Sequence, residues 1–458
     1  MILVLGHVKN NNKKCLKMRY THYMKQFHWV LLCICVAALI PRIFSVQWNI
    51  IDHGDIKGDV TAAYSLITHH QLRTSDELDL SLTPDFIPPG IGRSLLVSHP
   101  PVWALLGAAA LIVFQREPTF DNAFFALKIL SVLCGLLVVV LTAVVGRRLF
   151  DTRTSLVIAF WIASSYLMID YSGNGALYSL QTVTYFVWII VAYKDMKSKP
   201  CALGVASGLG YLVNHQSMVL AAASVIVLLV TDRSWKQKIT DLVTVTLVTF
   251  AVASPWLIRN YRIFGDLFFS HAVNATYIYV KAAVPREIID GREHFILGFF
   301  GHIEILRSML MVWLPNNLYY IARKLFILAP VLFLFFSFAC VDYVFSPQRR
   351  KIMLPIIALL VLHIFLSASW PVTKFRYFVP MLPLVFFVSV DQIRSLSFSP
   401  RVRDVLFGLI TACILILSYM TYLSVPTHTY YYDGAITNDP FHGREEYNYL
   451  IRRGILTK

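Results

Sequence analysis

Long apolar runs, separated by short polar connections, fill the sequence from Trp29 to Val425. A helix of about 20 apolar residues is long enough to cross a hydrocarbon core of about 30 Å. The pattern therefore predicts an all-α polytopic membrane protein with about eleven transmembrane helices. The predicted spans are approximately residues 28–47, 123–146, 154–171, 177–193, 201–214, 216–231, 239–258, 325–345, 352–369, 376–392 and 404–424.

The segment at residues 99–114, HPPVWALLGAAALIVF, is apolar but short, and two prolines follow its first residue. Its length suits an interfacial or re-entrant helix as well as a span, and one more crossing here would invert every later connection. If it does not cross, every short basic cluster lies in the cytoplasm, where such clusters are enriched. We therefore predict an external juxtamembrane helix. The clusters then placed inside are Lys9, Lys13, Lys14, Lys17, Arg19 and Lys25; Arg147, Arg148 and Arg153; Lys194, Lys197 and Lys199; Arg233, Lys236 and Lys238; Arg349, Arg350 and Lys351; and Arg394, Arg401 and Arg403.

A second ambiguity is the pair of short runs at 201–214 and 216–231, which only the turn VNHQS around Asn214 and His215 separates. Merging them into one helix would flip the later topology. The flanking connections YKDMKSK and DRSWKQK are both basic and are expected to share a side. We therefore predict two spans.

This threading divides the chain into a basic cytoplasmic tail at 1–27, a transmembrane domain at 28–424 and a short external tail at 425–458. Within the transmembrane domain, residues 48–122 form the first external loop and residues 259–324 a later one. The first loop carries nine carboxylates against four lysines and arginines, so it is acidic.

Composition and charge narrow the class of protein. Only 15% of the residues are charged and 57% are apolar, whereas soluble domains carry about a quarter charged residues, which excludes a secreted or cytosolic enzyme. The net charge of +15 lies in clusters between apolar runs, so it indicates cytoplasmic loops and no nucleic-acid partner. The cysteines lie in apolar runs or in the basic tail, which indicates neither a disulfide framework nor a CxxC metal site.

Candidate chemistry gathers in the predicted external segments. Asp52, Asp55 and Asp59 follow the first span directly, and carboxylates at the mouth of a helix bundle can act as a general base or bind a cation. The alternative is that they only keep the loop solvated. His99 opens the predicted surface helix, where its imidazole could hydrogen-bond a phosphate or a sugar hydroxyl, or simply mark the helix start.

Two basic pairs lie outside under the same threading, where the charge rule disfavours cations. Arg259 and Arg262 end the seventh span in PWLIRNYRIFG, and Lys374 and Arg376 separate two later spans. Arginine recognises phosphate through two parallel hydrogen bonds, and phosphate at the outer interface usually belongs to a lipid. Interfacial snorkelling of the side chains is the alternative.

Charged residues are scarce within the spans, where Asp170 and Lys128 are the clearest examples. No chain of buried acids suggests a proton relay, which disfavours a coupled transporter. The histidines and acids of 259–324 show no metal-site spacing such as HExxH, so no metal ligands are predicted.

Six strings, in order, resemble the GT-C superfamily of polyprenyl-phosphate-dependent membrane glycosyltransferases, in particular the glycosyltransferase family 39-like group. The resemblance covers residues 29–392. It rests on an acidic residue after the first span, the HPP motif, GRRLFDTR, YSGNGALYSL (similar to that group's YSQEARMYSL), PWLIRNYRIFG and FRYFVPMLPL.

The resemblance implies a GT-C-like bundle with external juxtamembrane helices. It also implies transfer of a sugar from an undecaprenyl- or dolichyl-phosphate carrier to a lipid, glycan or protein acceptor of the cell envelope. The reaction would take place on the external face of a bacterial plasma membrane. No nucleotide cofactor is expected, because no glycine-rich phosphate loop is present. The resemblance leaves open whether a divalent cation assists the reaction.

Residues carried over from that group give the expected site. Asp59 best matches the catalytic aspartate of the first loop, with Asp52 and Asp55 as rivals, and it would deprotonate the acceptor hydroxyl. His99 matches the histidine of the HPP motif. Arg259 matches the arginine after the PW motif and, with Lys374 and Arg376, would stabilise the leaving phosphate. Two tyrosines of the second external loop are expected to bind substrate, and these are Tyr171 and Tyr178.

The chain departs from the family pattern in the second loop. The family's glutamate falls on Asn174 and its arginine on Ala176. Asparagine forms hydrogen bonds but takes up no proton, so either Asp170, one turn away, supplies the carboxylate, or the protein is altered in substrate or activity. A lipid-linked saccharide flippase is the alternative from another class.

Overall fold

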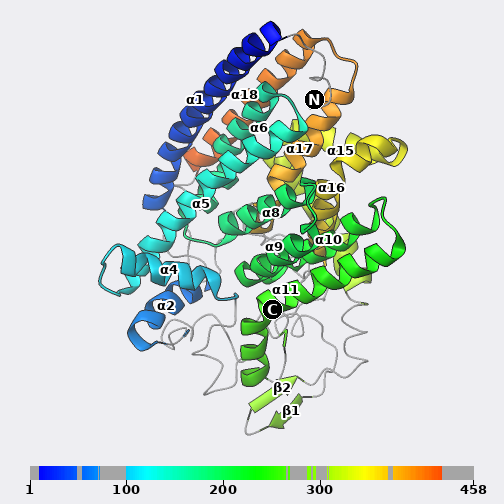
Figure 1. Ribbon diagram of the computed structural model, residues 1–458. Helices are drawn as coiled ribbons and strands as arrows, with labels where there is room; N and C mark the ends of the chain where they lie inside the picture. The colour runs from blue at the N-terminus through cyan, green and yellow to red at the C-terminus, as the bar shows by residue number, and fades with distance from the viewer. Residues whose placement is uncertain are drawn as a thin grey trace.

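The structure is a computed structural model. It describes residues 10–48, 54–70, 72, 99–264, 267–268, 286–289, 292–295, 307, 309–369 and 375–424. Within these ranges it is a bundle of helices with one two-stranded hairpin (Figure 1). The elements are α1 (Asn10–Trp48), α2 (Gly54–His69), α4 (Val102–Val113), α5 (Phe120–Leu149), α6 (Thr152–Ser164), α7 (Tyr166–Gly173), α8 (Tyr178–Tyr193), α9 (Lys199–Val213), η2 (His215–Met218), α10 (Val219–Leu229), α11 (Trp235–Phe264), β1 (Arg286–Ile289), β2 (Arg292–Phe295), η3 (Met309–Trp313), α14 (Leu314–Leu328), α15 (Pro330–Phe345), α16 (Pro347–Ala368), η4 (Phe375–Phe378), α17 (Met381–Ser395) and α18 (Pro400–Ser424).

Each of the eleven predicted spans overlaps one helix or two consecutive helices, but the number of crossings is not confirmed. Among the described residues, five helices are long and apolar enough to cross a bilayer, namely α1, α5, α11, α16 and α18. The pair α6 and α7, bent by 58° at its break, makes a sixth if it is one span. The helices α8, α10 and α15 are apolar but have 16, 11 and 16 residues.

The predicted surface helix is α4, whose 12 residues extend only about 18 Å at 1.5 Å per residue. That is shorter than a hydrocarbon core of about 30 Å, so α4 does not cross it alone. It packs between α2 and α5 at the lower left of Figure 1. Gly107 permits the close approach, because a Cβ there would lie 2.8 Å from Leu127 Cδ2.

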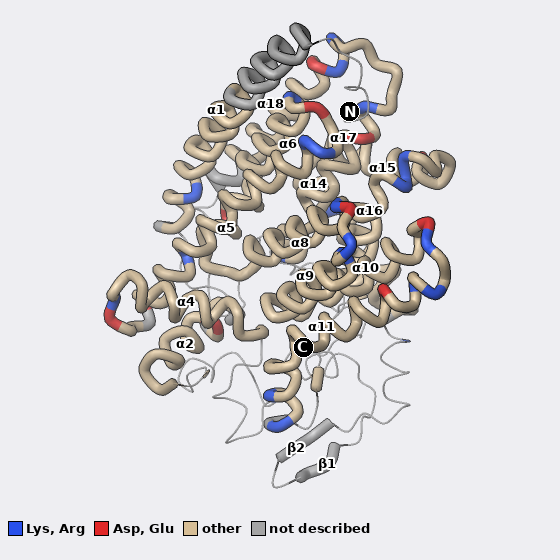
Figure 2. The backbone as a smooth tube through the Cα atoms, viewed as in Figure 1, with Lys and Arg blue, Asp and Glu red and all other residues tan. Residues whose placement is uncertain are grey.

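The connections that the charge pattern placed on one side lie together at one end of the bundle. Asp151, before α6, accepts a hydrogen bond from Arg394 at the end of α17. Lys351 on α16 forms an ion pair with Asp232, in the α10–α11 connection, at 2.8 Å. Charged residues are concentrated at helix ends and connections, and the helix middles are mostly uncharged (Figure 2).

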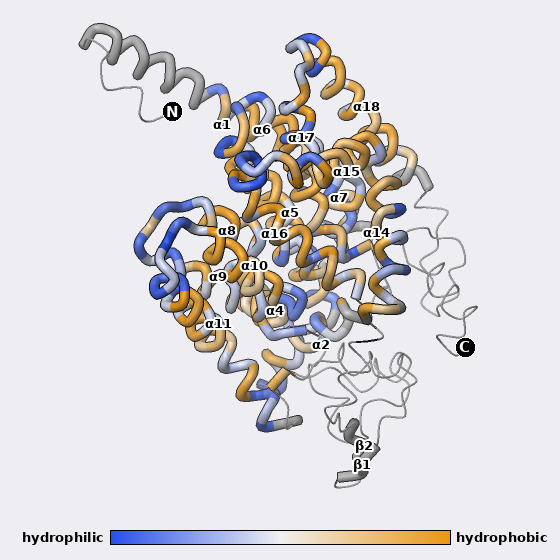
Figure 3. The backbone as a smooth tube through the Cα atoms, turned by 90° about the vertical axis from the view of Figure 1, so that its right-hand side faces the viewer, coloured by the Kyte–Doolittle hydropathy of each residue, from blue (hydrophilic) through white to orange (hydrophobic). Residues whose placement is uncertain are grey.

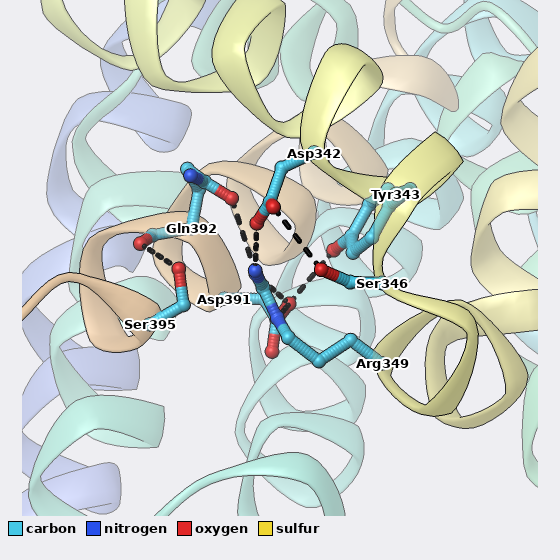
Figure 4. A network of polar contacts seen from close by, with 7 residues as sticks. All are labelled: Asp342, Tyr343, Ser346, Arg349, Asp391, Gln392 and Ser395. Carbon is cyan, nitrogen blue, oxygen red and sulfur yellow. Dashed lines mark hydrogen bonds and ion pairs between the residues drawn. The ribbon is translucent and has the colours of Figure 1, made fainter.

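Arg349 joins three helices at this same end (Figure 4). Its guanidinium contacts Asp342 of α15, and it binds Asp391 of α17 at 2.6 Å. The hydroxyl of Tyr343 donates to the same Asp391 carboxylate at 2.9 Å. The charge of this arginine is therefore compensated from both neighbouring helices.

The outer helices present apolar side chains away from the bundle. In the most apolar stretch of α18, only 17% of the residues are buried, and in that of α11 only 22%. Such surfaces suit contact with lipid, because in water they would be large exposed apolar patches. Figure 3 shows these apolar helix lengths between more polar ends.

A break between α6 and α7 redirects the chain towards the second predicted external loop. A continuous helix would pair Tyr166 N–H with a carbonyl one turn earlier, but here it donates to Ser418 Oγ of α18 at 3.0 Å. Arg42 of α1 donates through Nη1 to the Ala163 carbonyl at 3.0 Å. Two other helices thus satisfy the backbone groups that the break releases, as an apolar interior requires.

Candidate active site

Asp59 and His99 form a buried pair at the end of the molecule opposite the basic connections. Asp59 lies on α2 and is 1% exposed, and His99 directly precedes the two prolines before α4 and is 8% exposed. The distance between Asp59 Oδ2 and His99 Nδ1 is 3.0 Å. An ionised carboxylate can only accept, so Nδ1 carries the proton, and a neutral ring then has its lone pair on Nε2. The arrangement matches a carboxylate that orients an imidazole base.

His215 adds a second imidazole to this region, and it was not among the predicted site residues. It begins η2 in the short turn between α9 and α10, with its ring 5.3 Å from that of Tyr211. Burial, together with a smaller effect of the nearby His99, lowers the pKa of His215 to about 3. Its imidazole is therefore neutral near pH 7 and free of charge repulsion with His99. The sequence signal was the polar NHQ interruption between two apolar runs.

An apolar cluster joins the four elements around these side chains. Ala62 of α2, Ala104 of α4, Tyr211 of α9 and Trp256 of α11 pack together. Arg259, one turn beyond Trp256, has its Cζ atom 4.3 Å from the centroid of the Trp256 ring. Stacking on the indole holds the guanidinium in one orientation, and the cluster brings Arg259 to the same end of the molecule as Asp59 and His99.

The second-loop tyrosines form a further group. The Tyr171 and Tyr178 rings meet edge to face with centroids 5.7 Å apart. Arg376 of η4 has its Cζ atom 5.9 Å from the Tyr178 ring centroid and 5.5 Å from that of its neighbour Tyr377. The structure thus brings Arg376 to the second loop, although about 200 residues of sequence separate them.

Asn174 has a local structural role in this loop. Its Oδ1 accepts from the Ala176 backbone N–H at 2.9 Å, which closes the turn. The next residue, Gly175, has φ +84°, a conformation that favours glycine. Trp103 of α4 donates through Nε1 to the Gly175 carbonyl at 2.9 Å. This bond ties the second loop to the helix that follows His99, and Trp103 was not among the predicted site residues.

The other predicted site residues take part in none of the contacts described above. Asp170 is half-buried near the end of α7, and Arg262 is exposed near the end of α11. The backbone of Asp55 lies in α2, but its side chain is outside the described residues. Asp52 and Lys374 are also outside them.

A second cation beside Arg376 was missed. Lys324 of α14 is 4% exposed, and its Nζ lies 4.9 Å from the ring centroid of Phe375. It directly precedes a predicted span, and a lysine at the buried edge of an apolar run is the signal that could have indicated it.

A divalent cation is held by several carboxylate, imidazole or thiolate groups that lie close together. Within the described ranges, no three His, Cys, Asp or Glu residues are grouped as a metal site would require.

Comparison with known proteins gives one family match by sequence. A family model described as dolichyl-phosphate-mannose-protein mannosyltransferase matches residues 98–258. The matched range begins beside His99 and ends beside Arg259. No curated protein matches the chain.

Solved structures extend the likeness to most of the chain. The oligosaccharyltransferase AglB from Archaeoglobus fulgidus, in complex with an inhibitory peptide and a dolichol-phosphate, matches with a TM-score of 0.53 at 14% identity, over 90% of this chain and 56% of that one. ArnT from Cupriavidus metallidurans in the apo state matches with a TM-score of 0.52 at 14% identity, over 93% and 73%. This chain therefore spans little more than half the length of AglB. At such identity the likeness establishes the fold alone, which this chain shares with AglB and ArnT.

Proposed function

We propose that this multi-pass GT-C membrane protein is a glycosyltransferase that moves a sugar from a polyprenyl-phosphate carrier to a hydroxyl-bearing acceptor. The acceptor would be a lipid, glycan or protein of the cell envelope, on the non-cytoplasmic face of a bacterial plasma membrane. The observation that carries the proposal is the buried Asp59–His99 contact of 3.0 Å at the end of the molecule that also holds Arg259. The family match and the shared fold support the class of reaction.

The reaction needs a base and an anion-binding group. The acceptor oxygen attacks the anomeric carbon, its proton passes to the Asp59–His99 pair, and the bond from that carbon to the carrier phosphate oxygen breaks. Either Asp59 itself or His99 Nε2, oriented by Asp59, takes the proton. Attack opposite the leaving group inverts the anomeric centre.

Arginine side chains are suited to the leaving phosphate. Arg259 is held against Trp256, and Arg376 is held near Tyr178. A guanidinium donates two parallel hydrogen bonds to a phosphate and keeps its charge at any physiological pH. Donors that are already oriented before charge develops on the phosphate lower the barrier.

Purified protein with labelled polyprenyl-phosphate sugars and membrane extract tests the proposal. We expect Asp59→Asn and His99→Ala each to reduce transfer by about 10²- to 10⁴-fold, the usual contribution of a general base. Asp404→Asn, which removes an exposed ion pair with Arg153 at the opposite end, is the control and should keep the wild-type rate.

Three results would contradict parts of this proposal. Full transfer by both Asp59→Asn and His99→Ala would contradict the assigned base. Movement of labelled carrier across vesicles without a new glycosidic bond would favour a flippase. Transfer by neither wild type nor variants, with phenotype rescue by Asp59→Ala, would favour a catalytically altered relative, the reading that Asn174 in place of the family's glutamate suggests.

A further inference from the structure

A chain of buried hydrogen bonds crosses the bundle between two segments of the candidate site. It begins at Asn214, which donates through Nδ2 to Gln181 Oε1 of α8 at 3.0 Å. Gln181 Nε2 contacts the Tyr185 hydroxyl at 3.4 Å, and that hydroxyl lies 2.7 Å from His363 Nδ1 of α16. His363 Nε2 lies 3.0 Å from the Tyr377 carbonyl. All five residues are at most 5% exposed.

The direction of these bonds is determined at both ends. The Tyr377 carbonyl can only accept, so His363 Nε2 carries a proton. The two hydrogen-bond partners of the His363 ring, a hydroxyl and a carbonyl, are both uncharged. A charged imidazole between them is disfavoured in an apolar interior. Nδ1 is therefore the acceptor, and Tyr185 donates to it.

The first residue of the chain is held in a similar way. Asn214 Oδ1 accepts from the Gln216 backbone N–H at 3.0 Å, which leaves the Asn214 amide nitrogen as the donor to Gln181. With both ends held, the direction of the hydrogen bonds cannot reverse. Two members, Asn214 and Gln181, are amides, which do not take up a proton and pass it on. These features exclude a proton wire and indicate a rigid connection.

Both ends of the connection lie beside residues of the candidate site. Asn214 precedes His215, whose ring lies 5.3 Å from that of Tyr211, which packs with Ala62 of α2 and Ala104 of α4. Tyr377 follows Arg376, whose guanidinium lies near Tyr178. The connection therefore links the turn on the side of the Asp59–His99 pair to the turn that presents a phosphate-binding cation.

We infer that Tyr185 and His363 are positioning residues that hold the Arg376 turn and the His215 turn in register across the site. The inference rests on the proposed function for what Arg376 binds. The spacing between the base and the donor phosphate would then depend on side chains that touch neither substrate. Loss of one bond leaves buried donors or acceptors unpaired at both neighbours, and the strain is relieved by movement of the attached turns.

Tyr185→Phe tests this with the smallest change, because only the hydroxyl is lost. The matched control is Tyr193→Phe on the same helix, which loses one hydrogen bond to the Ile352 carbonyl at the opposite end of the bundle. We expect backbone amides of 215–218 and 376–379 to exchange hydrogen at least about fivefold faster in Tyr185→Phe than in Tyr193→Phe. Exchange that is equal in the two variants overturns the inference, whether or not the enzyme transfers sugar.

Affinity for undecaprenyl phosphate, measured by equilibrium binding, gives the functional consequence. Tyr185→Phe should raise the dissociation constant about fivefold to twentyfold, with Tyr193→Phe unchanged. In an Arg376→Ala background the effect should vanish, because the connection acts through Arg376. His363→Gln, which can still donate to the Tyr377 carbonyl, should recover part of the affinity lost in His363→Ala.

The outcomes separate this inference from the proposed function. If wild type neither binds undecaprenyl phosphate nor transfers sugar, the proposed function fails, and the exchange comparison still decides the positioning role. If wild type binds and transfers but Tyr185→Phe matches Tyr193→Phe in affinity and exchange, the positioning role fails alone.

Discussion

At the scale of single residues, the site depends on side chains whose roles come from their neighbours. His99 taken by itself is a histidine before two prolines, and beside Asp59 it is an oriented imidazole, the base that we propose. Arg259 is similar, because a flexible cation at a helix end becomes a fixed one when its Cζ atom lies 4.3 Å from the Trp256 ring. A planar guanidinium can stack on the ring and still donate two parallel hydrogen bonds. A lysine ammonium has neither a planar face nor such paired donors.

We predict that Arg259→Lys raises KM for the polyprenyl-phosphate donor about tenfold with a smaller effect on kcat, because ground-state phosphate binding is weakened. The control is Lys238→Arg near the start of the same helix, where Lys238 Nζ lies 5.1 Å from the Trp235 ring. Steady-state transfer kinetics at varied donor concentration measures the effect. An unchanged KM in Arg259→Lys would remove Arg259 from the donor site.

At the scale of elements, the break between α6 and α7 decides where the second loop lies. The chain turns by 58° there, and α7 leads into Tyr171 and the turn at Asn174. A break in a helix releases backbone N–H and C=O groups, which must then bond to other partners when they are buried. In this protein Ser418 and Arg42, from two other helices, provide those bonds.

Ser418→Ala should destabilise the protein by about 1–3 kcal/mol, because the Tyr166 N–H loses its acceptor in a partly buried position. Ser337→Ala is the matched control, since Ser337 Oγ donates to the Phe333 carbonyl one turn earlier on an exposed helix face. Thermal unfolding in detergent should show a clear loss for the first variant and a change within about 0.5 kcal/mol for the second. Equal losses would mean that α18 does not support the break.

At the scale of the whole molecule, ion pairs at the basic end hold helices together that are far apart in sequence. Asp151 accepts from the Thr154 backbone N–H at 2.9 Å and also contacts Arg394 of α17. Burial would raise the pKa of the Asp151 carboxyl, but the hydrogen bonds from Thr154 and Arg394 outweigh it and hold that pKa below its usual value. The ionised group therefore stabilises the fold above its unfolded pKa of about 4, and that contribution is lost as pH falls further.

Asp151→Asn should therefore lower the melting temperature at pH 7, and the difference from wild type should shrink as the pH falls below about 4. Asparagine keeps the capping oxygen, so the comparison isolates charge from capping. Thermal unfolding across pH measures the difference. A gap between the two proteins that stays constant down to pH 3 would contradict the role given to the charge.

The sequence by itself determined the class of protein and most of its helices. Apolar runs of bilayer length must form helices, because a backbone in lipid has no water to bond, and the basic clusters assigned connections to a common end. It also indicated Asp59, His99, Arg259 and Arg376 one by one. The number of crossings is not confirmed, since α8, α10 and α15 are apolar but have only 16, 11 and 16 residues.

Only the tertiary structure decided which of these residues meet. Asp59 and His99 are 40 residues apart, and their contact depends on how α4 packs beside α2 and α5. The places of His215, Trp103 and Lys324 also follow from packing, because a polar residue in an apolar run carries no local signal of its partner. The chain from Asn214 to Tyr377 could not be read from sequence for the same reason, since it exists only where four separate segments converge.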